Sequence, residues 1–332
     1  MRHPLARIPV LALVTALAFG LAGCGGEAST DGDGGTASGA FPVTIPNTYG
    51  ETVVEKRPAR VVSIGFHEHD ILLALGVRPV AVQQWMAEYK NGIGPWATPL
   101  LGDAKPKMFP STAAELNMGE IAKLKPDLIV GTYREVSRSD YELLSKMAPT
   151  LVRPKGYVDY AVPYEIETKM IGKALGKEKE ANSLVAAAEK KFADARKAHP
   201  EFEGRTAAIA YPMENGGLGI YNSGDPRGEF LRKLGFTIPK AVDEAAGDKF
   251  YTELSPERLD LVGDVDVLLI IDFGLPKDLY AKNALFQRLD VAKRGNYVYP
   301  LPYTNAVSHN DVVSIPYCID KVVPVIAKTL EK

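Results

Sequence analysis

The sequence predicts an α/β fold of two lobes, each built on a parallel sheet and joined by a single long helix. The first observation is a helical repeat over residues 177–198, with apolar side chains at Ala181, Leu184, Val185, Ala188, Phe192 and Ala195. The second is that both flanks repeat one order: an apolar run, a helical pattern ending in Leu-Gly, a further helix, an acidic turn and a buried strand. The third is that runs such as residues 267–271 are apolar throughout, as expected for strands covered on both faces.

The first flank alternates strand and helix patterns. Residues 41–55 indicate a β segment with a turn at 47–50. Core strands are predicted at residues 60–64, 80–82, 127–130 and 151–153. Helices are predicted to end at Gly76 and to span residues 115–125, 140–147 and 165–175. Residues 85–99 hold both tryptophans with two glycines and two prolines, which indicates an aromatic loop.

The second flank begins with a strand at residues 205–210, after Pro200 has ended the long helix. The glycines of residues 211–221 indicate a hairpin insertion, and a helix then ends at Gly235. Later elements are predicted as a strand at 267–271, a helix at 285–289, a strand at 297–301 and a final helix at 311–330, broken or kinked by Pro316 and Pro324.

The N-terminus has the anatomy of an export signal. Arg2 and Arg7 precede an apolar run at residues 8–22, and Leu21-Ala22-Gly23-Cys24 matches the bacterial lipobox. We therefore expect residues 1–23 to be a lipoprotein signal peptide and Cys24 to carry the lipid. Residues 24–40 are rich in Gly, Ser, Thr and Asp, and indicate a flexible tether. The expected domains are an N-terminal lobe at 41–163, linker helices at 164–199 and a C-terminal lobe at 200–332, anchored at the extracytoplasmic face of the cell membrane.

Composition excludes several functions. A formal net charge of −2 over 332 residues gives no basic footprint for nucleic acid. With Cys24 lipidated, the second cysteine, Cys318, is expected to be a buried thiol without a disulfide. The chain contains no Gly-x-Ser-x-Gly elbow and no phosphate-binding loop, and no nucleophile and base are paired in it, so we expect no enzyme.

Residues 67–70, His-Glu-His-Asp, form one metal-like cluster, to which His309 and Asp311 could add ligands. Residues two apart at a helix start do not share a face, so a four-ligand metal site is not expected. A single contact from His67 to a ligand is expected instead, because His67 follows the carboxyl end of a strand. Ligands of open parallel sheets bind beyond those ends.

The same rule selects the other ligand-binding candidates. The first lobe offers strand-end side chains at His67, Trp85, Tyr133, Arg134 and Arg153, of which we expect Arg134 to lie on an exposed loop. The second lobe offers Tyr211, Phe273 and Tyr303, with Tyr221 on the hairpin. Trp96 and Tyr160 belong to loops near the same face. The predicted site is thus lined by aromatic rings with few cations.

Several phrases resemble the iron–siderophore-binding lipoproteins of bacterial ABC importers, the class III substrate-binding proteins. They are ILLALGVRPVAV, IAKLKPDLIVG, MIGKALGKEKEA, EFLRKLG and VVSIPYCIDKVVP, while GIGPWATPLLGDAKP resembles the actinobacterial branch. The resemblance implies a monomer that binds a ferric siderophore and docks on the permease through one Glu of each lobe. Glu229 matches one of these positions. The other holds Gly119, so Glu120 or Glu115 would replace it.

The resemblance also bears on the ligand. Iron in a siderophore is already six-coordinate, so the protein would supply no metal ligand and no cofactor. Few cations can be placed at the site, which favours a neutral or weakly charged hydroxamate over a trianionic catecholate. A carrier of cobalamin, haem or a bare transition-metal ion is the alternative within the fold. A surface lipoprotein enzyme is the alternative outside it.

Overall fold

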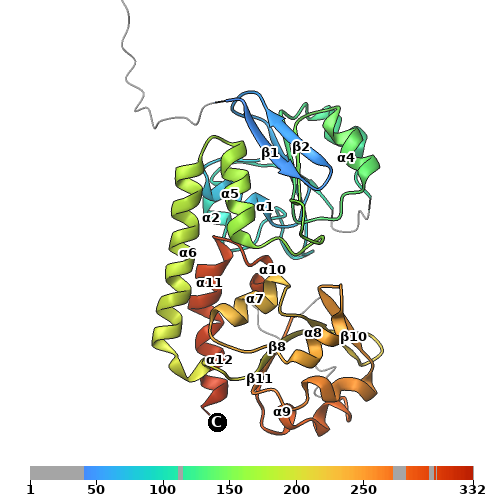
Figure 1. Ribbon diagram of the computed structural model, residues 1–332, viewed down its shortest axis with the longest axis vertical. Helices are drawn as coiled ribbons and strands as arrows, with labels where there is room; N and C mark the ends of the chain where they lie inside the picture. The colour runs from blue at the N-terminus through green and yellow to red at the C-terminus, as the bar shows by residue number, and fades with distance from the viewer. Residues whose placement is uncertain (1–40, 111–114, 272–281, 299–302, 304, 332) are drawn as a thin grey trace, which may run out of the picture. The chain divides into compact units, whose positions relative to one another are not determined.

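The computed structural model describes residues 41–110, 115–271, 282–298, 303 and 305–331, all within one compact unit of the chain (Figure 1). The predicted signal peptide, Cys24 and the tether lie outside the described residues. Within the part that is described, no helix is both long enough and apolar enough to cross a membrane.

The N-terminal sheet consists of five parallel strands in the order β5-β4-β3-β6-β7. The strands are β3 (Val61–Ser63), β4 (Ala81–Gln83), β5 (Lys107–Phe109), β6 (Leu128–Gly131) and β7 (Thr150–Val152). Every residue of β3 and β6 is buried, and all of them except Ser63 are apolar or glycine, as expected for strands covered on both faces. A hairpin of β1 (Val43–Asn47) and β2 (Gly50–Val54) precedes this sheet, as predicted.

Helices connect successive strands of this sheet. They are α1 (Glu68–Ala74), α2 (Thr98–Leu101), α3 (Met118–Lys123) and α4 (Arg138–Ser145). Helix α1 is followed by Gly76, whose φ of +73° is a left-handed conformation that glycine adopts without strain. This is the ending that the Leu-Gly pattern predicts.

Two helices follow the sheet, α5 (Tyr164–Ala174) and α6 (Glu178–Ala198), and they pack side by side (Figure 1). Helix α6 is the predicted long helix, with Ala181, Val185, Ala188, Phe192 and Ala195 buried. Gly172 permits the close approach of α5, because an added Cβ would lie 2.3 Å from the Cβ of Ala181.

The C-terminal sheet is mixed, in the order β10-β9-β8-β11-β12. Its strands are β8 (Ala207–Pro212), β9 (Leu218–Tyr221), β10 (Tyr251–Leu254), β11 (Val267–Ile270) and β12 (Tyr297–Val298). Strands β8, β11 and β12 run parallel, whereas β9 pairs antiparallel with both β8 and β10. The predicted hairpin is therefore confirmed as β8–β9, and the fold class of two α/β lobes is confirmed with it.

The helices of this half are α7 (Pro226–Lys233), α8 (Lys240–Ala246), α9 (Asp290–Lys293), α10 (Ala306–His309), α11 (Ser314–Lys321) and α12 (Val323–Leu330). Short 3-10 turns cover Pro200–Phe202, Pro256–Val262 and Phe286–Arg288. Helix α11 packs against α6, and α12 packs on β11 and β12 (Figure 1). Cys318 in α11 is buried and free, as predicted.

The prediction of one helix from residue 311 is wrong in two details. Asp311 precedes the helix, which begins at Ser314, so Pro316 lies in the first turn and breaks nothing. The break falls at Val322, two residues before Pro324, which lies in the first turn of α12, where proline is tolerated.

Candidate ligand-binding site

Partly exposed aromatic side chains form a continuous row of ring contacts from the N-terminal to the C-terminal lobe. The ring of Phe66 lies 5.6 Å from that of Trp85 and 6.2 Å from that of Tyr160, between centroids. Tyr160 contacts Phe250 of the other lobe at 5.7 Å, and the row continues to Tyr251 at 4.8 Å. The aromatic belt, as we call it, comprises Phe66, Trp85, Tyr160, Phe250, Tyr251 and Tyr211. Since each ring is only half buried, a ligand can contact it.

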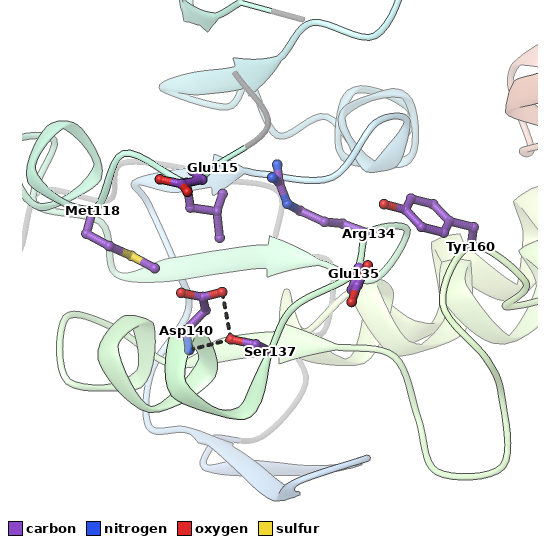
Figure 2. A pocket seen from close by; sticks show the side chains of 8 residues that line it. Glu115, Met118, Arg134, Glu135, Ser137, Asp140 and Tyr160 are labelled. Carbon is purple, nitrogen blue, oxygen red and sulfur yellow. Dashed lines mark hydrogen bonds between the residues drawn. The ribbon is translucent and has the colours of Figure 1, made fainter. Parts of the chain in front are cut away.

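A cavity of about 380 Å³ opens beside the belt in the N-terminal lobe (Figure 2). Arg134 and Tyr160 lie on one side of it, and Glu115, Ser137 and Asp140 line the rest. Ser137 caps α4 by accepting a hydrogen bond from the backbone N–H of Asp140. This volume lies in the range of small-molecule sites.

Arg134 is buried, with 7% of its surface exposed, so the expectation of an exposed loop residue is wrong. Its Nη1 donates to the backbone oxygen of Ile64 at 3.0 Å, and its guanidinium carbon lies 5.9 Å from the centre of the Phe66 ring. These contacts hold the side chain against the end of β3, the central strand of the sheet. Burial lowers the pKa of the guanidinium.

Tyr133 and Arg227 connect the two lobes. The Tyr133 hydroxyl accepts a hydrogen bond from Nη2 of Arg227 at 3.3 Å, and both side chains are buried. Arg227 also forms a two-pronged ion pair with Asp225 at 2.7 and 2.8 Å and lies over the Tyr221 ring at 3.7 Å. Burial lowers the pKa of Arg227, but Asp225 outweighs this effect and raises it. The charge of Arg227 is therefore neutralised within the protein.

Beneath the belt lies a group of buried ionisable side chains, which we call the polar floor: His67, Glu68, His69, Asp70, Glu167, His309 and Asp311. His67 Nε2 lies 2.9 Å from Glu167 Oε2, and His67 Nδ1 lies 2.5 Å from the backbone oxygen of His309. Burial by itself lowers the pKa of His67, but Glu167 outweighs burial and raises it to about 9. His67 is therefore an imidazolium that joins the lobes.

The remaining floor residues are predominantly acidic. Trp96 donates a hydrogen bond to Asp70 Oδ2 at 2.5 Å, and the same oxygen lies 3.2 Å from Nδ1 of His309. Burial raises the pKa of Asp70 to about 6, and burial together with Asp70 raises that of Asp311 to about 7. Burial lowers the pKa of His309 to about 3. The floor thus combines four carboxyl groups with one protonated imidazole.

Most of the residues predicted for the ligand site meet at the belt and the floor: His67, Trp85, Tyr133, Arg134, Tyr160, Tyr211 and Tyr221. Trp96 is instead a buried anchor for Asp70. Arg153 is paired with Asp159 and fixes the 154–159 loop. Tyr303 packs partly buried against the core. Phe273 lies outside the described residues.

Of the predicted docking residues, Glu115 lines the cavity beside the belt, whereas Glu229 and Glu120 are held by lysines. Glu229 is 18% exposed and lies 3.9 Å from Nζ of Lys233, so it faces a neighbouring lysine. Glu120 pairs with Lys107 and Lys123, which lower its pKa to about 2. Glu115 and Gly119 are exposed.

Four residues of the site were not predicted from the sequence: Phe66, Phe250, Tyr251 and Arg227. Phe66 directly precedes His67, so the strand-end rule that selected His67 also applies to it. Arg227 could have been predicted, because a cation in the first turn of α7 is unfavourable with the helix dipole. A residue at such a position is expected to have a specific partner. Phe250 and Tyr251 depend on β10, which the sequence did not indicate.

Comparisons with known proteins agree with this architecture. The model of the periplasmic binding protein family matches residues 61–272. The Fe(3+)-citrate-binding protein YfmC of Bacillus subtilis is 27% identical over 290 residues, covering 87% of both chains. A periplasmic solute binding protein of Mycobacterium smegmatis is 27% identical with a TM-score of 0.78, over 87% of this chain and 99% of that one. Streptococcus pneumoniae PiaA in complex with ferrichrome is 26% identical with a TM-score of 0.76, over 87% and 98%.

The family match covers more than half of the chain and contains β3 to β11, which are all strands of the two five-stranded sheets except β12. Proteins of this family bind and deliver solutes and do not transform them. The chain therefore belongs to the periplasmic binding protein family, as a non-enzymatic binding protein with the two-lobe α/β fold of class III.

Proposed function

We propose that this protein captures a ferric siderophore of the hydroxamate type at the aromatic belt and delivers it to the permease subunits of an ABC importer. It acts as a monomer on the extracytoplasmic face of the cell membrane, held by a lipid on Cys24 and a tether over residues 24–40. The proposal includes the domain boundaries, with an N-terminal lobe at 41–163, linker helices at 164–199 and a C-terminal lobe at 200–332. It also includes membership of the actinobacterial branch.

The observation that carries the proposal is an aromatic belt above an acidic floor. Flat rings from both lobes can pack the methylene groups of a chelator, while Arg134 beside the cavity can donate to its oxygens. Arg227 is neutralised by Asp225, and the floor places carboxyl groups beneath the belt. A trianionic catecholate would be repelled there, whereas a hydroxamate complex of low charge would not.

Two of the relatives bear directly on the choice of ligand. The complex with ferrichrome shows that a protein with this fold and 26% identity accommodates a ferric chelate of that kind. YfmC is named for ferric citrate, which makes ferric citrate the second candidate here. The acidic floor disfavours citrate complexes of high negative charge, so we place the hydroxamate first.

Delivery requires docking on the permease. We assign Glu229 and Glu120 to this contact, one on each lobe, following the family pattern. Both carboxylates have lysine neighbours in the free protein, so docking would exchange Lys233 in one lobe, and Lys107 with Lys123 in the other, for cations of the permease.

Tryptophan fluorescence titration tests the ligand assignment. The panel contains ferrioxamine, ferrichrome, ferric citrate, ferric enterobactin, haem and cobalamin. We expect one-to-one quenching by the ferric hydroxamates with a Kd of about 1 μM or tighter, and weaker binding of every other compound. In Trp85→Phe, which leaves Trp96 as the sole tryptophan, most of the quenching should disappear. Tighter binding of ferric citrate, haem or cobalamin than of any hydroxamate would overturn the assignment.

A further inference from the structure

Three residues of the polar floor have the composition and spacing of a metal site. His67, His309 and Asp311 each offer one donor atom, and these three atoms lie within 4.8 Å of one another. His67 comes from the turn between β3 and α1, whereas His309 and Asp311 come from the connection between α10 and α11. The site is thus assembled by two segments more than 200 residues apart.

Donor atoms at this position lack hydrogen-bond partners. The Nε2 atom of His309 and the Oδ2 atom of Asp311 are buried and have no hydrogen-bond partner among the described residues, whereas Nδ1 of His309 lies 3.2 Å from Oδ2 of Asp70. Leaving such groups unsatisfied is unfavourable, and buried polar atoms without partners are rare in folded proteins. A bound ion would satisfy these atoms together.

The carboxylate of Asp311 is held in place for such a role. Its Oδ1 atom accepts hydrogen bonds from the backbone N–H groups of Val313 and Ser314, at 2.7 and 3.0 Å. The Oδ2 atom therefore points away from its own helix and lies 3.9 Å from Nδ1 of His309. Orientation of one carboxylate oxygen by the backbone leaves the other oxygen available as a ligand.

The two histidines have the outer partners that metal-bound imidazoles commonly have. His67 contacts Glu167 through Nε2, and His309 contacts Asp70 at 3.2 Å through Nδ1. A carboxylate beside a metal-bound imidazole fixes the ring orientation and strengthens the nitrogen donor.

We propose that His67, His309 and Asp311 bind a divalent first-row transition-metal ion directly, beneath the aromatic belt. Two imidazole nitrogens and one carboxylate oxygen suit Zn²⁺, Fe²⁺ or Co²⁺ and do not suit Ca²⁺ or Mg²⁺. His69 is not part of the set, because it follows His67 by two residues at the start of α1 and lies on another face. Ligation by His67 requires its imidazolium to release one proton to solvent, and the ring nitrogen that is freed to exchange its present partner for the ion.

This inference does not rest on the proposed siderophore. A siderophore saturates its own iron, whereas this site would take a bare ion from solution. Because its ligands come from both lobes, the ion would also join them, so metal binding should raise the melting temperature of the protein.

Cobalt is the probe of choice, because Co²⁺ bound by histidine and carboxylate in a four-coordinate site absorbs visible light strongly. The tag-free protein is treated with EDTA, dialysed and titrated with Co²⁺, and Zn²⁺ is then used to displace the cobalt. We expect one Co²⁺ per chain, visible absorption bands, and loss of the bands on addition of Zn²⁺. A protein that shows no saturable binding, or binds Co²⁺ without visible bands, would overturn the proposal.

Matched variants locate the ion. His309→Gln and Asp311→Asn should each weaken Co²⁺ binding by at least about 100-fold, since even outer partners of metal ligands are worth 10- to 100-fold. The controls are His199→Gln and Asp320→Asn, whose side chains are 27% and 61% exposed, and we expect them to bind as the wild type does. Equal affinity in all four variants would place the ion elsewhere and refute the assignment.

A second measurement covers the case in which a floor variant does not fold. X-ray absorption at the zinc edge of the wild-type complex should show two imidazole ligands with additional oxygen ligands, and a spectrum with fewer than two imidazoles would refute the site. Titration of the EDTA-treated protein with ferrioxamine is run in parallel. Metal binding can fail while ferrioxamine binds, or the reverse, so the two proposals are judged separately.

Discussion

Glu229 provides a test of the electrostatics of this fold. Its carboxylate is mostly buried between helices, with Glu165 of α5 and Glu189 of α6 nearby and with Lys233 and Arg232 on its own helix. Lys233 Nζ donates to Glu165 and Glu189 at 2.6 Å each, so Glu229 shares this lysine with two closer carboxylates. Burial and Glu165 together raise the pKa of Glu229 to about 7.

The free-energy consequence follows from linkage. The folded protein holds a proton on Glu229 up to about pH 7, whereas the unfolded chain releases it near the ordinary value of 4.5. The folded state therefore binds more protons between these values, and stability falls as the pH rises through this window. Since each pKa unit corresponds to about 1.4 kcal/mol, ionised Glu229 should lower the free energy of unfolding by up to about 3 kcal/mol above pH 7.

Glu229→Gln removes the ionisation while keeping the shape of the side chain. Urea unfolding followed by circular dichroism should show the variant up to about 3 kcal/mol more stable than the wild type at pH 8, and nearly equal at pH 4.5. Glu244→Gln, at a side chain that is 63% exposed, is the control and should change stability little at either pH. A variant that is equally stable or less stable at pH 8 would refute the reasoning.

Three further outcomes are expected. Arg134→Ala should weaken binding of a ferric hydroxamate by roughly tens- to a thousandfold and should also lower the melting temperature. Arg138→Ala, at an exposed side chain, is the control and should change neither. Unchanged binding in Arg134→Ala would exclude Arg134 from the site. Arg227→Met should lower the free energy of unfolding by about 3–5 kcal/mol, because it leaves Asp225 buried without its partner. If the double variant Arg227→Met with Asp225→Asn regains no stability, loss of the ion pair is not the cause. X-ray scattering of the free and ligand-bound protein should give nearly equal radii of gyration, because helix α6 bends less readily than a loop hinge, and a large decrease on binding would contradict this.

Much of the fold could be predicted because its signals are local. Helix α6 repeats buried residues at helical spacing, so periodicity identifies it, and β3 and β6 lie in short runs of mostly apolar residues, which indicate buried strands. Strands β5 and β10 escaped prediction because they lie at sheet edges, where only one residue of each is buried. A half-exposed edge strand leaves no continuous apolar run to read.

The site was predicted only in part, for a different reason. The strand-end rule indicated Trp85, Tyr133 and Arg134, because that rule depends on sheet topology alone. Which loops meet across the two lobes depends on packing, so the contact of Tyr133 with Arg227 could not be derived. The burial of Arg134 likewise depends on how its loop folds back onto β3.

The most direct test of the central claim is a crystal structure of the protein with a gallium hydroxamate, since Ga³⁺ replaces Fe³⁺ in such chelates without redox chemistry. We expect the chelate to lie against the aromatic belt, between Trp85 and Tyr211, with Arg134 within hydrogen-bond distance of a chelate oxygen and no protein atom bound to gallium. A chelate bound on any other face, or density for the chelator only outside the belt, would contradict it.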